Sequence, residues 1–232
     1  LYLHGGAFVI GSPKGYRGLA GELGRATGVP AYSVDYRLAP EHVFPAAVED
    51  AAAAYKALLE RGVQPDRIVI AGDSAGGGLA LSTLVRLRDE GVPLPAAALL
   101  ISPWVDLACT GESIKSKAQD DPSLTEEGLR AMAALYLGGA SSAEPLASPL
   151  HAELSGLPPL LVQVGSAEIL LDDAVRIAAR AGAANTHVQL EVWPDAVHVW
   201  HAFAFMLPEG RQAIEAAGDF LRRRLGSADG DA

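Results

Sequence analysis

A single serine stands at the point where a buried strand pattern changes into a helix pattern. Arg67–Ala71 is an apolar run of strand length, and Ala75–Asp89 has apolar residues at helical spacing. The connecting residues, Gly72-Asp73-Ser74-Ala75-Gly76-Gly77, place a glycine two positions either side of Ser74, which permits a very tight turn. Such a turn presents the hydroxyl at the top of a sheet, beside a helix N-terminus that favours developing negative charge. We predict that Ser74 is a catalytic nucleophile; the alternative is a Ser/Gly-rich helix start without chemistry.

Short apolar runs alternate with helical patterns along most of the chain. Further runs of strand length are Val29–Val34, Ala96–Ile101, Leu160–Val164 and Val188–Trp193, and further helical patterns are Pro45–Arg61, Leu171–Ala183 and roughly Glu209–Leu225. Because the strand runs are mostly continuously apolar, we expect a mostly parallel sheet with helices on both faces. This predicts an α/β fold in which residues 1–225 form one domain, followed by a flexible tail at 226–232.

One segment breaks this alternation. From about Trp104 to Leu150 there is no clear strand, and a single helical stretch lies near Thr125–Leu137. In an open α/β sheet, an insertion here lies beyond the carboxyl ends of strands, where ligands bind. We expect residues 104–150 to form a lid or cap, the alternative being an ordinary excursion packed on the surface.

Charge and cysteine content exclude several function classes. Asp plus Glu is 28 and Lys plus Arg is 18, and a net charge of -10 disfavours binding to nucleic acid or anionic membranes. The longest apolar stretch, Leu94–Ile101, is far shorter than the roughly 20 residues of a membrane span. Cys109 is the only cysteine, which excludes an internal disulfide and a cysteine-based metal site and agrees with a reducing, cytoplasmic location.

A pair of glycines near the start suggests an anion-binding loop. His4-Gly5-Gly6-Ala7-Phe8 follows the strand-like Leu1–Leu3, and adjacent glycines let backbone N–H groups converge on one point. With the serine turn elsewhere in the chain, we expect an oxyanion hole made by two of the N–H groups of Gly5, Gly6 and Ala7, together with that of Ala75. The His4 side chain is expected to brace the loop. A generic glycine turn is the alternative.

The general base is predicted from chain order. Hydrolases of the α/β type place the nucleophile, the acid and the histidine in that order, with the histidine after the last strand. The last strand run is followed by Pro194-Asp195-Ala196-Val197-His198, so we predict His198 as the base and keep His201 as the alternative. His187 precedes that strand and suits a solvated turn.

The acid is sought after the preceding strand run, Leu160–Val164. Glu168 comes first in the loop that follows, at the carboxyl end of the strand, where its carboxylate can reach an imidazole. Asp172 is the alternative, although it and Asp173 suit the first turn of the next helix. Asp73 is expected to point away from the Ser74 hydroxyl and to brace the surrounding loops.

Five stretches together resemble one known family. They are His4–Phe8, the serine turn Gly72–Gly77, Val197–His201, Tyr36–Ala46 (Tyr-Arg-Leu-Ala-Pro-Glu-His-x-Phe-Pro-Ala) and Ser102–Leu107 (Ser-Pro-Trp-Val-Asp-Leu). Their order and spacing from residue 1 to about 225 resemble the bacterial hormone-sensitive-lipase-like esterases. The resemblance implies an α/β-hydrolase fold, a small-molecule ester substrate, no cofactor and no metal, and often a homodimer.

The resemblance also specifies the reaction and the branch of the family. It implies cleavage of short- to medium-chain carboxylic esters by a Ser-Glu-His triad through an acyl-enzyme. Where the family usually has Asp-Pro-Leu, this chain has Glu168-Ile169-Leu170, which resembles the glutamate branch, with Asp172 aligned to a second, structural acid. The family's third glycine is Ala7 here, a change that keeps the backbone donor. Phe8, Trp104, Trp200 and Phe203 are aromatic candidates for an acyl pocket, each also suited to the core.

Two further expectations concern the start of the chain and rival functions. The chain begins at Leu1 within a strand-like run, so we expect N-terminal strands and cap helices of the family to be missing. A catalytically impaired fragment is therefore one alternative to an active esterase. A second alternative is a hydrolase-fold protein that binds a ligand without turnover, which the presence of His198 disfavours. A third alternative is a hydrolase that cleaves another bond, such as an amide or a sugar acetate.

Overall fold

The computed structural model describes residues 1–226, in which five parallel strands form one sheet. The strands are β1 (Tyr2–Leu3), β2 (Val69–Asp73), β3 (Ala97–Ile101), β4 (Leu160–Gly165) and β5 (Val188–Trp193). They lie side by side in the order β1-β2-β3-β4-β5, and each neighbouring pair is parallel. The mostly parallel α/β sheet predicted from the sequence is therefore confirmed.

One predicted strand is wrong. Val29–Val34 is irregular apart from a single bridge between Ser33 and Tyr2. Pro30 has no N–H to give to a ladder, and a proline inside a run of strand length disfavours a strand there. The segment still runs beside β1, since Tyr2 donates its N–H to Tyr32 O (2.8 Å) and Val34 donates to Tyr2 O (3.0 Å).

The longer helices supply the two outer layers. They are α1 (Arg17–Thr27), α2 (Ala46–Glu60), α3 (Ala75–Asp89), α6 (Leu171–Ala183) and α7 (Pro208–Arg222), and a short 3-10 turn, η1 (Pro65–Arg67), precedes β2. The sequence patterns predicted all of the longer helices except α1. Gly18, Gly21 and Gly24 lower the helical propensity of α1, and packing against α7 stabilises it instead.

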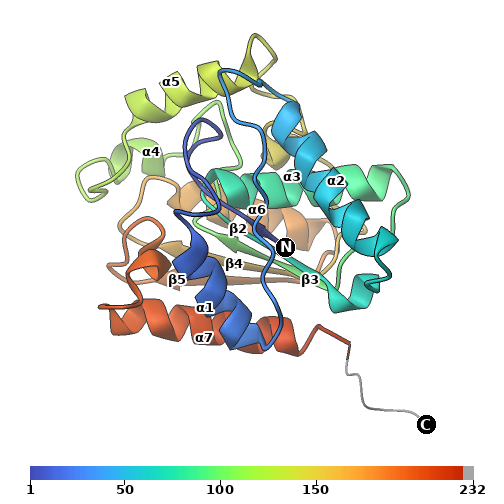
Figure 1. Ribbon diagram of the computed structural model, residues 1–232. Helices are drawn as coiled ribbons and strands as arrows, with labels where there is room; N and C mark the ends of the chain where they lie inside the picture. The colour runs from blue at the N-terminus through green and yellow to red at the C-terminus, as the bar shows by residue number, and fades with distance from the viewer. Residues whose placement is uncertain (227–232) are drawn as a thin grey trace.

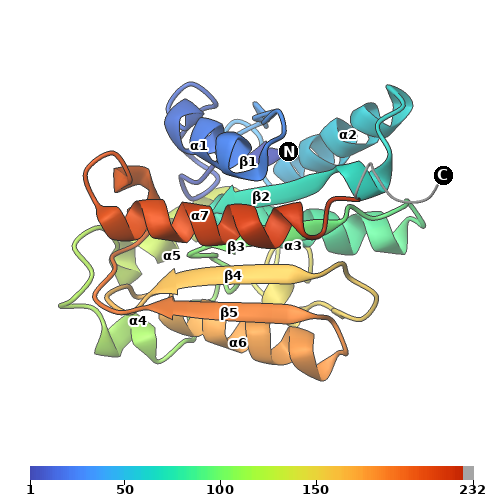
Figure 2. The same ribbon diagram turned by 90° about the horizontal axis from the view of Figure 1, so that it is seen from below.

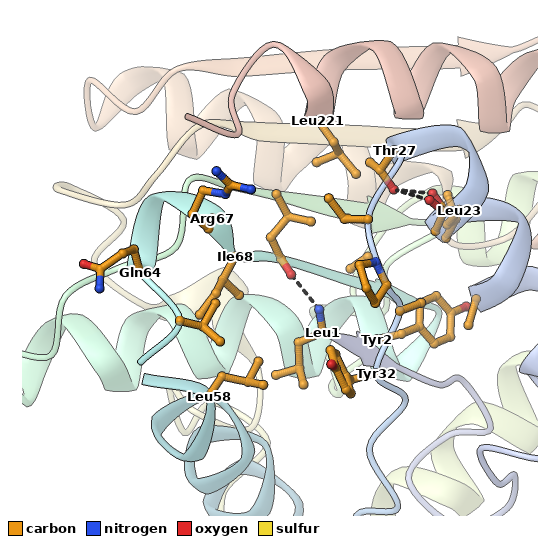
Figure 3. A pocket seen from close by; sticks show the side chains of 18 of the residues that line it. Leu1, Tyr2, Leu23, Thr27, Tyr32, Leu58, Gln64, Arg67, Ile68 and Leu221 are labelled. Atoms are coloured by element: carbon orange, nitrogen blue, oxygen red, sulfur yellow. Dashed lines mark hydrogen bonds between the residues drawn. The ribbon is translucent and has the colours of Figure 1, made fainter. Parts of the chain in front are cut away.

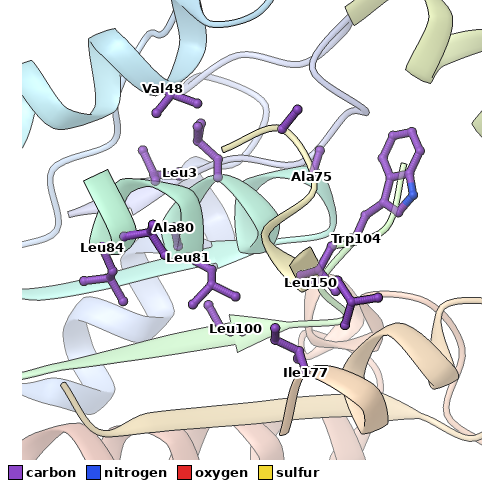
Figure 4. Packing of buried hydrophobic residues seen from close by; sticks show 14 of the residues in the cluster. Leu3, Val48, Ala75, Ala80, Leu81, Leu84, Leu100, Trp104, Leu150 and Ile177 are labelled. Atoms are coloured by element: carbon purple, nitrogen blue, oxygen red, sulfur yellow. The ribbon is translucent and has the colours of Figure 1, made fainter. Parts of the chain in front are cut away.

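Alternation along the buried strands divides the core between the two faces of the sheet. Ile70, Leu100 and Val162 belong to the core cluster that contains the buried residues of α2, α3 and α6. Figure 1 shows these three helices on one side of the sheet, and Figure 4 shows Leu100 on the α3 side of β3. Val69, Leu99 and Leu161 face α1 and α7 on the other side. Both faces are therefore covered, which explains why the strand runs are continuously apolar.

Residues 104–150 contain no strand, as predicted. They form α4 (Ser113–Ser116), α5 (Glu126–Leu137) and η2 (Pro149–His151), and Thr125 caps α5 by accepting the Gly128 N–H at 3.1 Å. Figure 2 shows α4 and α5 on the side toward which the β4 and β5 arrows point. This segment therefore lies at the carboxyl ends of the strands, where α/β proteins bind ligands.

The C-terminal part of the chain is described as far as Gly226, which donates its N–H to Asp66 O at 3.0 Å. The rest of the predicted tail, 227–232, lies outside the described residues. Among residues 1–226, no helix combines the length and apolarity that crossing a bilayer requires.

Candidate active site

The turn around Ser74 has the tight geometry that its glycines predict. Ser74 lies between β2 and α3 with φ 54° and ψ -123°, a conformation uncommon for any residue with a side chain. A Cβ on Gly72 would lie 2.1 Å from Gly76 O, and one on Gly76 would lie 2.1 Å from Leu3 O. The two glycines are therefore needed because backbone segments approach too closely for any larger residue.

Ser74 opens onto a cleft of about 630 Å³ that also exposes His198. The polar part of the cleft is formed by Gly6, Ala7, Tyr16 and Asp73. Its apolar wall consists of Leu19, Leu124, Leu129, Met132, Val199 and Phe203. The cleft thus brings together four predicted site residues from distant parts of the chain: Gly6, Ala7, Ser74 and His198.

Glu168 lies behind His198 and contacts its imidazole. His198 Nδ1 and Glu168 Oε2 are 2.7 Å apart, and the Glu168 side chain is fully buried while 9% of the His198 side chain is exposed. A carboxylate at Nδ1 favours the tautomer with the proton there, which leaves Nε2 free to accept a proton. Within residues 1–226 Ser74 and His198 line the same cleft, and no hydrogen bond of normal geometry joins Ser74 Oγ to this imidazole.

The charge of Glu168 changes the acidity of His198. Burial lowers the pKa of the imidazole, but the nearby charge of Glu168 and its hydrogen bond, assisted by Asp121 and Asp73, raise it above its ordinary value. The arrangement therefore strengthens His198 as a proton acceptor.

The alternative base and acid lie elsewhere. His201, in the 3-10 turn η3 (Trp200–Phe203), is fully buried, with Nε2 2.9 Å from Gln163 Oε1, and burial lowers its pKa to about 3. Asp172 accepts the N–H of Ser113 (2.9 Å) in the first turn of α6, and Asp173 accepts that of Val105 (2.8 Å). Both carboxylates thus anchor residues 104–150 rather than His198.

The glycine loop leaves its second and third N–H groups free. Gly6 and Ala7 have φ values of 112° and 54°, both line the cleft, and within residues 1–226 neither donates a hydrogen bond. Gly5, by contrast, donates its N–H to Asp73 Oδ1 at 3.0 Å, so this N–H is already occupied. Ala75 is the first residue of α3, where backbone N–H groups have no partner inside the helix.

Asp73 braces the loops around the nucleophile, as expected. Its Oδ1 accepts hydrogen bonds from Tyr2 Oη (2.5 Å) and from Gly5, and burial raises the pKa of this carboxyl to about 6. His4 is fully buried and stacked on Tyr36, with ring centroids 4.3 Å apart, and Tyr36 Oη donates to His4 O at 2.6 Å. The His4 side chain therefore holds the glycine loop in place.

Three residues of the site were not predicted from the sequence. Ser102 contacts Glu168, Tyr16 lines the cleft, and the Asp121 carboxylate accepts the N–H of Ile169, beside Glu168, at 2.9 Å. Asp121 also accepts the N–H of Leu124 (2.9 Å) in the cleft wall. Ser102 stood in a recognisable motif without an assigned role, whereas nothing in the local sequence around Tyr16 or Asp121 distinguishes them.

Of the four aromatic candidates for an acyl pocket, only Phe203 lines the cleft. Phe8 is buried and stacked on Tyr136, with centroids 3.9 Å apart, and Trp104 and Trp200 are buried as well. Core packing therefore explains these other three.

A second hollow, of about 420 Å³, lies beside β1 and contains none of the predicted site residues. Figure 3 shows Leu1, Leu58, Ile68 and Leu221 around it, and the hydrogen bond from the Leu1 amino group to Val69 O (2.7 Å). Its lining is largely apolar and lacks a histidine or an acidic side chain. Among residues 1–226 no group of three or more His, Cys, Asp or Glu side chains has the arrangement of a metal site.

The parallel sheet, the strand-turn-helix at Ser74 and the cleft at the strand ends define an α/β hydrolase. Residues 1–202 match the family model described as the alpha/beta hydrolase fold. The chain belongs to this family, and within it to the bacterial hormone-sensitive-lipase esterases.

Relatives of this chain are esterases. An acetyl-hydrolase of Streptomyces hygroscopicus is 54% identical over 226 residues, which are 97% of this chain and 76% of that protein. An esterase of Acinetobacter venetianus is 39% identical, covering 94% of this chain and 73% of that protein. The crystal structure of an esterase from the bacterial hormone-sensitive lipase family, 55% identical, superimposes with a TM-score of 0.96 over 97% of this chain and 76% of that one. The protein is a carboxylic ester hydrolase.

Proposed function

We propose that the protein is a serine carboxylesterase that cleaves short- to medium-chain esters through Ser74, His198 and Glu168. The observation that carries this proposal is the 2.7 Å contact between His198 Nδ1 and Glu168 Oε2, behind an imidazole that shares its cleft with Ser74. A carboxylate behind an imidazole that shares its cleft with a serine supports the assignment of these three residues as acid, base and nucleophile.

In the first step Ser74 Oγ attacks the ester carbonyl while His198 Nε2 takes the hydroxyl proton. Glu168 holds the imidazole by Nδ1 and stabilises the imidazolium that forms. The N–H groups of Gly6 and Ala7, with that of Ala75, stabilise the negative oxygen of the tetrahedral intermediate. His198 then gives its proton to the leaving alcohol, and an acyl-enzyme remains on Ser74.

In the second step water replaces the alcohol. His198 Nε2 takes a proton from water, the resulting hydroxide equivalent attacks the acyl carbonyl, and the same N–H groups stabilise the second oxyanion. Collapse of this intermediate releases the carboxylic acid, while the proton on His198 returns to Ser74 Oγ. No cofactor is needed for either step.

The preference for short to medium acyl chains is argued from the cleft and from the relatives. The apolar wall of Leu124, Leu129, Met132 and Phe203 suits a hydrocarbon chain, and a cleft of about 630 Å³ is within the usual size for small-molecule sites. A relative is named an acetyl-hydrolase, and the 53% identical EstE5, whose structure has a TM-score of 0.95, was soaked with p-nitrophenyl butyrate.

Residues 104–150 are proposed as a fixed cap within a single catalytic domain of residues 1–225. Its residues Leu124, Leu129 and Met132 contribute to the apolar wall of the cleft, and backbone hydrogen bonds that the segment donates to Asp172 and Asp173 hold it against α6. We therefore expect substitutions such as Met132→Trp to change acyl-chain preference more than the turnover of the shortest ester.

Turnover of p-nitrophenyl acetate, butyrate and octanoate by the wild-type chain and by Ser74→Ala tests the proposal. We expect the butyrate ester to be cleaved more efficiently than the octanoate, and the Ser74→Ala variant to lose at least about 10³-fold in kcat. Full activity of Ser74→Ala would exclude the proposed nucleophile. Equal rates on an amide of the same acyl group would exclude the assignment to esters.

Location and assembly complete the proposal. We propose a cytoplasmic enzyme, on the ground of its single cysteine, and a homodimer, on the ground of the family resemblance. Cell fractionation and sedimentation of the purified protein measure these two properties directly.

A further inference from the structure

Ser102 lies directly after β3 and joins two loops of the site through one hydroxyl group. The residue is fully buried, and its N–H donates to Gln163 O on the neighbouring strand β4 at 2.7 Å. Its Oγ donates a hydrogen bond to Glu168 Oε1 (2.8 Å) and accepts one from the Val199 N–H (3.2 Å). A single side chain thus connects the carboxylate to the residue that follows His198.

The two oxygens of Glu168 are used differently. Oε2 contacts His198, whereas Oε1 accepts hydrogen bonds from Ser102 Oγ and from the Gly165 N–H at 2.7 Å. Two donors on one oxygen fix the rotation of a carboxylate, and hydrogen bonds to an ionised group are stronger than those between neutral groups. Without the Ser102 hydroxyl, only the Gly165 N–H would orient the carboxylate from that side.

The same strand end also supports the nucleophile. Ser74 donates its N–H to Ile101 O (2.8 Å), and Trp104 donates its N–H to Ser74 O (3.0 Å). β3 is paired on both sides, with β2 and β4, and all of its residues are buried. The segment from Ile101 to Trp104 is therefore a rigid support that contacts the loops of Ser74, Glu168 and His198 at once.

The backbone is strained at both ends of the hydrogen bond between Val199 and Ser102. Ser102 has φ 45° and Val199 has φ 52°, and a positive φ is unfavourable for both, most of all for the β-branched valine. Backbone strain of this kind persists where the surroundings enforce it, commonly at functional sites. The hydrogen bond from Val199 N–H to Ser102 Oγ joins these two strained residues.

We propose that Ser102 is a positioning residue for the hydrolytic reaction. Its hydroxyl, oriented by the hydrogen bond that it accepts from the Val199 N–H, holds the Glu168 carboxylate in the plane that meets His198. The inference rests on the proposed triad, because Ser102 acts through Glu168 and is not among the residues that line the cleft.

A double-mutant cycle between Ser102 and Glu168 tests this role. We expect Ser102→Ala to lower kcat about 10- to 100-fold, the loss associated with a hydrogen bond to a charged group, with KM changed less than about twofold. In a Glu168→Ala background, where the carboxylate is already gone, the same substitution is expected to change kcat by less than about twofold. Such non-additivity distinguishes positioning from a general loss of stability.

Two further variants separate the hydroxyl from its surroundings. Ser102→Gly also removes the hydroxyl but tolerates the positive φ, so it is expected to lose as much activity as Ser102→Ala and carries the test if the alanine variant does not fold. Ser148→Ala is the matched control, because Ser148 is equally buried and its Oγ accepts the Leu107 N–H at 2.9 Å away from the cleft. It is expected to keep kcat within about twofold of the wild type.

The outcomes distinguish this inference from the proposed triad. Unchanged kcat in a folded Ser102 variant, or an equal fractional loss with and without Glu168, would overturn the positioning role while leaving the triad intact. Wild-type activity of Glu168→Ala alone would instead exclude the triad, and the inference with it.

Discussion

His198 Nδ1 meets Glu168 Oε2 at 2.7 Å, whereas Asp172, four residues further along the chain, is directed to the Ser113 N–H. The two acids have different partners because they lie in different elements. Glu168 lies in the loop between β4 and α6, and Asp172 lies in the first turn of α6. Two acids close in sequence are thereby separated into one that contacts the base and one that anchors residues 104–150.

Substitution of the two acids separates these roles. We expect Glu168→Gln to lower kcat about 10²- to 10⁴-fold, because the amide loses the charge that stabilises imidazolium and can favour the wrong tautomer of His198. Asp172→Asn is expected to keep kcat within about tenfold, since it removes one anchor of the cap and leaves the imidazole partner in place. Steady-state kinetics on p-nitrophenyl butyrate measures both effects, and a larger loss in Asp172→Asn would reverse the assignment.

The pH dependence of turnover tests the electrostatic link between the same residues. Only neutral His198 accepts the Ser74 proton, so kcat/KM rises with pH as the imidazole loses its proton. Because Glu168 raises the pKa of His198, we expect the midpoint of this rise to lie above about 6.5. Removing the charge in Glu168→Gln leaves burial, which lowers the pKa, so the midpoint should move to lower pH while the plateau falls.

Profiles of kcat/KM between about pH 5 and pH 9 for the wild type, Glu168→Gln and Asp172→Asn provide this measurement. The Asp172→Asn profile serves as the control and should keep the wild-type midpoint. A midpoint that is the same in all three proteins would show that Glu168 does not set the pKa of the base.

Local patterns were sufficient to predict much of the fold. The strand-turn-helix at Ser74 and the parallel sheet follow from apolar runs and glycine positions, which act over a few residues. Val29–Val34 was wrong as a strand because Pro30 has no N–H for a ladder, and within residues 1–226 the segment forms only the bridge between Ser33 and Tyr2. The helix α1 was missed because its stability comes from α7, more than 180 residues later, rather than from its glycine-containing sequence.

The site shows the same division between local and long-range information. Ser74, His198 and Glu168 were predicted because each follows a strand in a known order. Ser102 and Asp121 act through hydrogen bonds to residues 66 and 48 positions away, respectively, which no local spacing encodes. The hydrogen bond from the Gly5 N–H to Asp73 joins residues 68 positions apart, so the sequence did not reveal that this candidate donor is occupied.

The glycine loop offers a matched pair of substitutions. Gly6 has φ 112°, and a Cβ there would lie 2.0 Å from Ile10 O, so Gly6→Ala must distort the loop. We expect this variant to lose about 10²- to 10³-fold in kcat, comparable to the loss of an oxyanion donor. Ala7→Gly keeps the backbone N–H and tolerates φ 54°, so kcat should stay within about threefold.

Kinetics and thermal unfolding of both variants check this prediction. The stability of Ala7→Gly should change by less than about 1 kcal/mol, because relief of the positive φ opposes the greater entropy of glycine in the unfolded chain. An activity loss in Ala7→Gly as large as that in Gly6→Ala would mean that the Ala7 methyl group, rather than its N–H, matters to catalysis.

The last prediction concerns stability rather than turnover. Asp173 is fully buried, and its Oδ2 accepts the N–H groups of Val105 and Asp106 (2.8 and 2.9 Å), while Oδ1 has no hydrogen-bond partner among residues 1–226. Burial raises the pKa of this carboxyl from 3.8 to about 7. In the unfolded chain the group loses its proton near pH 4, but the folded protein keeps it to about pH 7. The folded state therefore binds more protons across this interval, and its stability falls as pH rises through it.

Asp173→Asn removes the loss of stability that accompanies ionisation of Asp173, and the asparagine side chain keeps an acceptor for the two N–H groups. We compare the free energy of unfolding of the variant with that of the wild type. The difference between them is expected to grow by about 2–3 kcal/mol from pH 5 to pH 7, because one proton over one pH unit is worth about 1.4 kcal/mol. Urea unfolding at both pH values measures the difference, with Asp172→Asn as the control for an α6 acid that is not fully buried. If the difference in free energy of unfolding between variant and wild type does not depend on pH, Asp173 is ionised in the folded protein throughout this range. The two N–H donors would then outweigh the effect of burial on its pKa.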